Sequence, residues 1–315
     1  MGITNLAKLI KEFAPKAVIN KKITEYKTLC IDTSNYIYKY EYHSYDGTFL
    51  DGAIRQMIFL LQRNILPIYV FDGKPPKEKH YALEKRNICR EKQKNTVECL
   101  KIELDKITNE LDKTNFEKKI KKLEQSSIKI TKQHFKDLKE LIIIMGATYL
   151  EATGEADHLC AELVRKGICD ACITEDMDIL VSGATILRDF RTSTELVTEY
   201  KCATVCKELG LTYEQFVDLG ILCGYDSRPT IKGIGWKTAY KLIKEKGSIE
   251  AILETKTASK EFTYELFRKQ LTMGDEKFEK LTKWLQPKNR DKLAITEFIK
   301  NKGITLSVKQ QMWLF

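Results

Sequence analysis

Short apolar runs alternate with helix-like segments along the chain, and this alternation limits the fold more than any other feature. The runs are rich in β-branched and aromatic residues and lie at 28–31, 66–71, 147–150, 171–174 and 185–187. Strands that alternate with helices are typical of an α/β fold. We therefore predict a mostly parallel central sheet flanked by helices.

The helical segments are also visible in the sequence. In 155–166 the apolar residues recur at a spacing of 3.6 and Gly167 follows, as expected for an amphipathic helix that packs on the sheet. After Gly210 the pattern is wholly helical, with helices predicted at 213–222 and 236–246 and further helices up to the end.

Basic residues concentrate in one insertion. The 315-residue chain carries a net charge of +9, and residues 77–139 hold 18 Lys and Arg against 11 Asp and Glu. The segment is polar and helix-forming, and it follows Lys74-Pro75-Pro76, which ends a strand. It fits either a solvated helical hairpin or an arch that contacts nucleic acid, and the overall charge favours polyanionic partners.

The cysteines predict a reduced, intracellular protein. Their number, nine, is odd, and Met1–Ala14 mixes charged residues with apolar ones instead of forming a signal-peptide core. No apolar run is long enough to span a bilayer. A zinc site built from Cys169, Cys172, Cys202 and Cys206 is disfavoured, because the first two lie in or beside a strand at a spacing that faces opposite sides.

Acidic residues follow the carboxyl ends of the predicted strands, where functional groups gather in open parallel sheets. These residues are Asp32, Asp72, Glu155, Asp157, Asp176 and Asp178, and Asp226 lies in a loop between two later helices. Each one alone could cap a helix or form a turn. Together they would repel one another unless cations lie between them. Asp176 and Asp178, two residues apart in a segment expected to be extended, would point to the same side.

Oxygen ligands without a cluster of His or Cys select Mg²⁺, or Mn²⁺ in its place, over zinc. Two such ions about 3.5–4 Å apart can activate a water molecule and stabilise the leaving oxygen of a phosphodiester. The acids therefore predict metal-dependent phosphoryl-transfer chemistry.

Six motifs in this order resemble those of the flap endonucleases. They are Met1-Gly-Ile3, Ile31-Asp-Thr-Ser34, Tyr69-Val-Phe-Asp-Gly-Lys-Pro-Pro76, Gly154-Glu-Ala-Asp157, Thr174-Glu-Asp-Met-Asp178 and Ile231-Lys-Gly-Ile-Gly235. The resemblance extends from Met1 to about Leu253 and more weakly to the end. It implies a structure-specific 5′ nuclease that acts on DNA in replication and repair.

The resemblance implies two Mg²⁺ ions. One would be held by Asp72, Glu155 and Asp157, the other by Asp176, Asp178 and Asp226, with Asp32 acting through bound water. The family usually has Glu at the position of Asp157, so this carboxylate is retracted by one C–C bond, about 1.5 Å.

The resemblance also implies DNA-contacting residues. Lys79 and Arg86 of the insertion would contact the scissile phosphate, and Tyr38 would stack on a base or pack as an ordinary core aromatic. A helix-two-turn-helix element with a K⁺ ion would grip duplex DNA through Lys232, Gly233, Gly235 and Lys237. A simple glycine turn between packed helices is the alternative, and Trp236 replaces the proline that is common in the family.

These expectations divide the chain into five regions. They are the N-terminal part of the nuclease core (1–76), the helical arch (77–139), the internal part of the core (140–210), the helix-two-turn-helix region (211–260) and C-terminal helices (261–315). The predicted partner is branched DNA with a 5′ flap, bound by a monomer in the nucleus or at a cellular or viral site of replication. No full sliding-clamp box fits the segment 310–315, so clamp binding is left open.

Other functions remain as alternatives. A 5′ exonuclease, a Holliday-junction resolvase or an excision-repair endonuclease would share the metal site, and exonuclease activity could accompany flap cleavage. A non-catalytic DNA-binding protein would be expected to have lost some of the acids, and none of the seven positions has lost its acid. An aspartyl phosphatase is suggested only by Asp176-Met-Asp178 and does not explain the basic insertion.

Overall fold

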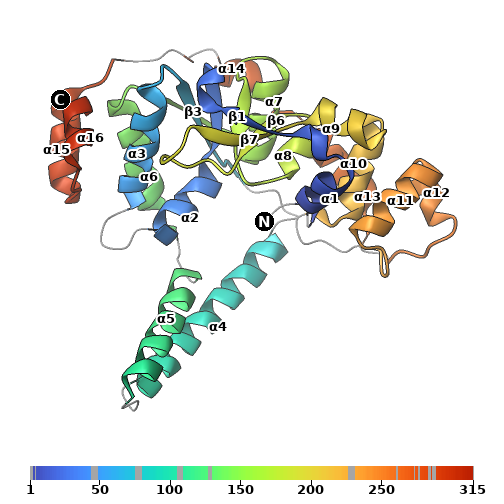
Figure 1. Ribbon diagram of the computed structural model, residues 1–315, viewed down its shortest axis with the longest axis horizontal. Coiled ribbons are helices and arrows are strands. Elements are labelled where there is room, and N and C mark those ends of the chain that lie inside the picture. Colours follow the sequence, from blue (N-terminus) through green and yellow to red (C-terminus); the bar gives the residue numbers. More distant parts are fainter. Residues whose placement is uncertain are drawn as a thin grey trace.

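The computed structural model describes most of the chain and reveals a seven-stranded sheet (Figure 1). It leaves out residues 1–2, 4, 44–48, 75–79, 105–108, 127–129, 226–230, 260–261, 273, 276, 283–284, 286–288 and 315, and the side chains of 43, 80–87, 110–111, 125–126 and 309. The strands are β1 (Val18–Lys22), β2 (Thr28–Asp32), β3 (Leu66–Phe71), β4 (Thr148–Glu151), β5 (Ala171–Ile173), β6 (Thr185–Arg188) and β7 (Leu196–Lys201).

The sheet is mixed but mostly parallel, in the order β1-β7-β6-β5-β2-β3-β4. The strands from β6 to β4 pair in parallel, whereas β7 pairs antiparallel with both β6 and β1. The predicted α/β fold is confirmed, and all five predicted strands are present. The sequence analysis missed β1 and β7, which read VINKK and LVTEYK and lack a continuous apolar run.

Each strand of the sheet's centre contributes side chains to two cores. On β2, Leu29 and Ile31 face one core and Cys30 the other. On β3 the same alternation places Tyr69 on the first side and Val70 on the second. A parallel sheet that is covered on both faces needs this pattern, because neither face is left to solvent.

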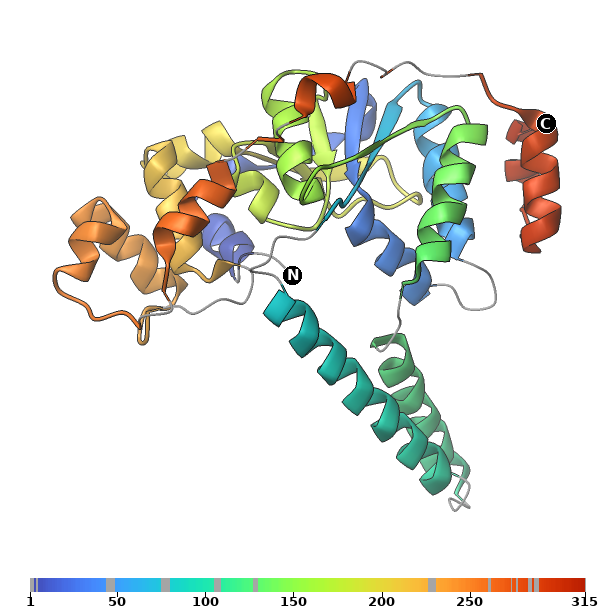
Figure 2. The same ribbon diagram turned by 180° about the vertical axis from the view of Figure 1, so that it is seen from behind.

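The helices divide between these two faces (Figures 1 and 2). The core that includes Leu29 is completed by α2 (Thr33–His43), α3 (Phe49–Leu61), α6 (Lys132–Ile144), α15 (Lys292–Lys302) and α16 (Val308–Leu314). The opposite core contains α1 (Leu6–Phe13), α7 (Ala156–Arg165), α8 (Asp178–Val181), α9 (Cys202–Leu209), α10 (Tyr213–Leu222), α11 (Trp236–Lys246), α12 (Ile249–Leu253) and α13 (Tyr264–Thr272). Short elements η1 (Pro15–Ala17), η2 (Ile23–Glu25) and α14 (Phe278–Thr282) complete the described secondary structure.

Local sequence explains where several helices begin and end. At the start of α10 the Thr212 hydroxyl accepts the Gln215 amide proton, while the Gln215 side chain accepts that of Thr212. After α7, Gly167 adopts a φ of 71°, which a residue with a Cβ rarely tolerates. The helices predicted at 213–222 and 236–246 coincide with α10 and α11.

The basic insertion forms two long helices that project away from the sheet (Figures 1 and 2). Helix α4 (His80–Leu104) pairs with α5 (Glu110–Ser126), and Val97, Leu100 and Ile120 form a small apolar cluster between them. Helix α6 then returns to the body of the protein and spans the expected boundary between regions 77–139 and 140–210.

The described C-terminal segment packs on the body rather than extending from it. The Leu314 side chain is fully buried, and Arg290 lies over the Trp313 ring at 4.0 Å from its centroid. Among the helices in the described part of the chain, none has both the length and the apolar character needed to cross a bilayer.

Candidate metal and nucleic-acid site

Three carboxylates converge at the carboxyl edge of the parallel strands. Asp157 lies in the first turn of α7, Asp176 follows β5, and Asp178 begins α8. Each contributes an oxygen atom to a group whose atoms all lie within 4.8 Å of one another. The local interpretation of Asp176 and Asp178 as part of an extended segment is wrong: the Asp178 amide donates to the Asp176 carboxylate at 2.9 Å, and the chain turns into α8 there.

A buried hydroxyl group links two of the acids. Thr174 is fully buried, its hydroxyl donates to Asp32 Oδ2 at 3.0 Å, and it accepts the amide proton of Asp176 at 3.0 Å. Asp32 also accepts the Asn35 amide proton at 3.3 Å near the start of α2. This hydrogen-bonded chain fixes Asp32 and Asp176 relative to each other, and it shows that both acids also stabilise local backbone structure.

Asp72 is held between three elements. One carboxylate oxygen accepts the Ala156 amide proton at 2.9 Å, at the start of α7, and the other accepts a short hydrogen bond from the Ser34 hydroxyl on α2. The next residue, Gly73, lies so close to the Ala152–Gly154 loop that an added Cβ would be 2.0 Å from the Ala152 carbonyl oxygen. Only glycine therefore allows this approach of the ends of β3 and β4.

Burial and mutual repulsion perturb the acids. Partial burial, followed by the charges of Asp32, Asp176 and Asp178, raises the pKa of Asp157 well above its usual range. Burial is also the main cause that raises the pKa of Asp32. Such carboxylates release their protons more readily when a cation lies among them, so this arrangement favours binding of a divalent metal ion.

Other acids at this edge have distinct surroundings. Glu155 is buried at the N-cap position of α7, as the sequence predicted for the start of this helix. Glu175 accepts from Lys39 at 3.4 Å and from Arg188 at 3.3 Å, so its charge is balanced by side chains of the protein. Asp226 lies outside the described residues.

Comparison with known proteins identifies the family. The XPG N-terminal domain model matches residues 1–93 and the XPG I-region model matches residues 146–226. Flap endonuclease 1 of Xiphophorus maculatus is 39% identical over 278 residues, which cover 82% of this chain and 70% of that protein. The chain belongs to the flap endonuclease family. The nuclease class that the sequence motifs predicted is thereby confirmed.

Solved structures show the same fold. The catalytic core of Rad2 in complex with a DNA substrate has a TM-score of 0.75, with 19% identity and full coverage of both chains. Flap endonuclease-1 from Methanococcus jannaschii has a TM-score of 0.67, with 23% identity and 94% coverage of each chain. These likenesses confirm the architecture, while the function of individual residues must be argued from this chain itself.

Tyr38, an expected DNA contact, lies between the body of the protein and the basic insertion. The Tyr38 ring on α2 is partly exposed and packs at the margin of the core. Its hydroxyl accepts a hydrogen bond from Arg90 of α4 at 3.3 Å, and the Arg90 guanidinium lies 5.6 Å from its ring centroid. Tyr38 is therefore a partly buried aromatic at the margin of the core, and its stacking on a base stays a prediction. Lys79 and the side chain of Arg86 lie outside what the structure describes.

The glycine turn before α11 is open on its outer side. Gly233 has a φ of 81°, and an added Cβ at Gly233 or Gly235 would meet none of the described residues within 4 Å. Lys232 is exposed, and Lys237 forms an ion pair of 2.5 Å with Glu12 of α1. Trp236 begins α11 in place of the family's proline and packs edge-on against Phe13, with ring centroids 6.2 Å apart.

Sequence reasoning assigned no role to Ser34 or Thr174. Both lie inside the motifs that resemble those of the family. Each is two residues from an acid, Asp32 or Asp176, and this spacing was the signal that could have revealed their role. The structure also gathers a different set of thiols from the zinc quartet considered above: Cys172 joins Cys30 and Cys160. No spacing rule reveals this group, because its members come from three separate elements.

Proposed function

We propose that this chain is a structure-specific nuclease that hydrolyses DNA near the base of a 5′ flap with the help of divalent metal ions. The observation that carries this proposal is the convergence of Asp157, Asp176 and Asp178 within 4.8 Å at one edge of the sheet, in a chain of the flap endonuclease family. The proposed substrate class comes from the relatives named flap endonuclease 1, and the proposed metal-dependent chemistry comes from the acidic residues.

The acidic residues would hold a pair of Mg²⁺ ions. Asp72, Glu155 and Asp157 would hold one, and Asp176, Asp178 and Asp226 the other, with Asp32 acting through water. When bound, such ions supply Lewis-acid chemistry that stabilises negative charge on the phosphate oxygens. The fit rests on the hard oxygen ligands and on the raised pKa of Asp157, whose carboxylate lies among like charges.

The chain's own hydrogen bonds keep the acids in place. Thr174 fixes Asp32 relative to Asp176, and Ser34 with the start of α7 fixes Asp72. Ligands that are already oriented need little rearrangement when substrate and cation arrive, which favours catalysis. We assign Ser34 and Thr174 as positioning residues.

The basic hairpin of α4 and α5 would receive the single-stranded flap. Its excess of Lys and Arg gives a sequence-independent attraction for phosphates. Arg90, in the first half of α4, connects that helix to Tyr38, so a strand passing from the hairpin to the acids would meet this pair. Lys79 and Arg86, near the start of α4, are proposed to contact the scissile phosphate.

The glycine turn before α11 would grip the duplex. Its open outer side admits a phosphate backbone and Lys232 adds positive charge, while Lys237, paired with Glu12 in this structure, would exchange that partner for a phosphate. A K⁺ ion at this turn, a monomeric state and work at sites of DNA replication belong to the same proposal.

Substrate selectivity is the decisive test. Labelled double-flap and four-way-junction DNA, with single-stranded and intact duplex DNA as controls, would be incubated with the protein in Mg²⁺, in Mn²⁺ and in EDTA. We expect one cut at the base of the 5′ flap, dependent on metal, and little cutting of the two controls. Cleavage of a four-way junction alone would favour a resolvase, and binding without any cleavage would favour the non-catalytic alternative.

The duplex grip has its own test. Gly235 has a negative φ of −86° and space for a Cβ, so Gly235→Ala should leave the melting temperature unchanged. We expect weaker binding to duplex-containing flaps and unchanged binding to single-stranded DNA, measured by fluorescence anisotropy. Gly154→Ala, which also has open space, is the matched control. Equal binding by both variants would exclude close DNA contact at Gly235.

A further inference from the structure

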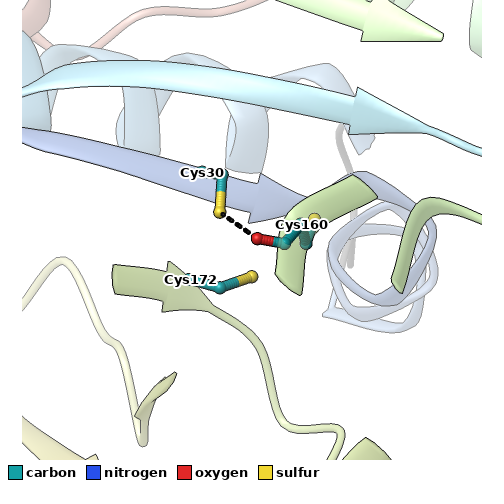
Figure 3. A group of neighbouring side chains, drawn as sticks. All are labelled: Cys30, Cys160 and Cys172. Atoms are coloured by element: carbon teal, nitrogen blue, oxygen red, sulfur yellow. Dashed lines mark hydrogen bonds between the residues drawn. The ribbon is translucent and has the colours of Figure 1, made fainter. Parts of the chain in front are cut away.

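Three cysteine thiols lie together directly beneath the acidic edge. Cys30 is on β2, Cys172 is its register partner on β5, and Cys160 is on α7, which packs across both strands (Figure 3). All three side chains are 0% exposed, and their sulfur atoms lie within 4.8 Å of one another. The group contains sulfur ligands only, in contrast to the carboxylate group above it.

The spacing suits coordination of one ion. Thiolate sulfur lies about 2.3 Å from zinc, so three sulfurs arranged around such an ion are about 4 Å apart. Closing the group around an ion therefore requires movements of less than about 1 Å. The Cys30 thiol at present contacts the carbonyl oxygens of Cys160 and Ala171, each at 3.7 Å, which are weak hydrogen bonds that a metal–sulfur bond would replace.

We propose that Cys30, Cys160 and Cys172 form a binding site for one soft, thiophilic divalent cation of the zinc and cadmium class. Binding would form three metal–sulfur bonds and release three thiol protons to solvent. A single buried cysteine is an ordinary small core residue. Three that converge from separate elements provide a ligand set, and sulfur favours soft cations over the Mg²⁺ that carboxylates prefer.

Short backbone segments connect the three cysteines to the residues of the acidic site. Cys30 precedes Asp32 by two residues on β2, Cys172 precedes Thr174 by two, and Cys160 follows Asp157 by about one helical turn. Drawing the sulfurs together would shift the strand ends and the start of α7. Occupation of the thiol site is therefore expected to slow flap cleavage, a consequence that rests on the proposed function, whereas binding itself does not.

The test uses Cd²⁺ as the probe and the full chain in reduced form. Cys89→Ser and Cys99→Ser remove the two exposed thiols and give the reference protein. Excess Mg²⁺ occupies carboxylates, and the ultraviolet charge-transfer band from thiolate to cadmium reports binding to sulfur. We expect one Cd²⁺ per chain, with binding weakened by more than about tenfold in Cys172→Ser or Cys160→Ser.

Cys206→Ser is the matched control, because Cys206 is also buried and its sulfur lies 4.0 Å from that of Cys202 outside the proposed site. It should retain the band. The proposal is overturned if the band is absent from the reference protein, persists in the Cys172 and Cys160 variants, or disappears in Cys206→Ser.

A second measurement needs no variant in the cluster and so does not depend on whether such variants fold. X-ray absorption of the cadmium-loaded reference protein should show three sulfur neighbours. A shell of oxygen, or of only two sulfurs, would overturn the proposal. Flap cleavage is measured separately on cadmium-free protein in Mg²⁺. A protein that binds cadmium but cleaves no DNA in its absence would leave the thiol site standing and refute the proposed function.

Discussion

The nuclease core and the helical hairpin of α4 and α5 are built in opposite ways. In the core, a sheet with apolar side chains on both faces is covered by helices, and its acids are fixed by hydrogen bonds such as that from Thr174 to Asp32. Between the two hairpin helices, among the described residues, only Val97, Leu100 and Ile120 are buried. The surface ion pair Lys101–Glu124, at 2.7 Å, adds little because both side chains are largely exposed.

Under the proposed function, this difference separates metal chemistry in the core from the binding of single-stranded DNA by the hairpin. Metal chemistry requires ligands held in fixed positions, which a densely packed core provides. A surface that receives single-stranded DNA requires positive charge and reach, and it can function with low local stability. We therefore expect changes in the core to alter folding or chemistry, and changes in the hairpin to alter substrate engagement while the core remains folded.

The largest effect is expected at the acidic group. Asp178→Asn removes a charged ligand but keeps the size of the side chain, and we expect cleavage to fall by about 10³-fold or more because several kcal/mol of transition-state stabilisation are lost. Single-turnover cleavage of a 5′ flap measures this loss. Glu151→Gln is the control, since Glu151 ends β4 at the same edge but is exposed and paired with Lys139. Equal rates in the two variants would contradict the assigned site.

Paired truncations compare the two regions directly. Leu29→Ala creates a cavity in the core and should lower the free energy of unfolding by about 2–5 kcal/mol. Leu100→Ala should loosen the hairpin, with less than about 1 kcal/mol lost from global unfolding. Urea denaturation measures the global loss, and hydrogen exchange of residues 80–126 measures the local one. A global loss in Leu100→Ala that equals that in Leu29→Ala would remove the distinction.

The next largest effect is expected at Gly73, where two backbone segments lie very close together. Gly73→Ala places a Cβ 2.0 Å from the Ala152 carbonyl oxygen and should cost about 1–3 kcal/mol of stability, with slower cleavage because Asp72 moves. Gly154→Ala, in the facing loop, has space for its Cβ and should be nearly neutral. Thermal melting of both variants distinguishes a specific contact from a general sensitivity of this edge.

The smallest effect concerns repulsion among the acids. Because the pKa of Asp157 is raised in the folded protein, its ionisation favours the unfolded state of the metal-free protein at pH values above the unfolded-state pKa of about 3.9. Asp157→Asn should therefore stabilise the protein in EDTA, by about 1 kcal/mol or less. The gain should be absent near pH 3, grow as the pH rises from about 3.9 towards the raised folded-state pKa, level off above it, and diminish in Mg²⁺. Denaturation between pH 3 and 8 tests the sign, and a destabilised variant at pH 8 would contradict it.

The sequence predicted the central strands and the acids that follow them because both signals are local. An apolar run marks β3, and Asp72 follows it directly. Strand β7, which lies between β1 and β6, was missed because its alternating polar residues resemble a loop. The turn at Asp176 was misread as extended, since the deciding hydrogen bond from the Asp178 amide is invisible in a residue pattern.

The sequence did not predict contacts between residues that lie far apart along the chain. The thiol group joins β2, α7 and β5, and only the strand register and helix packing bring Cys30, Cys160 and Cys172 together. The same applies to Tyr38 and Arg90, which belong to separate regions of the sequence. The contacts of Asp226 and Lys79 remain predictions from sequence.

The most direct test of the central claim is the metal dependence of a single turnover. A 5′-flap substrate would be bound to the protein in EDTA and the reaction started with increasing Mg²⁺, for the wild type and for Asp176→Asn. We predict no cleavage in EDTA, a wild-type rate that rises more steeply than the first power of Mg²⁺ at low concentration, and almost no cleavage by the variant. Cleavage in EDTA, or a wild-type rate in Asp176→Asn, would show that the acidic edge of the sheet is not where the reaction occurs.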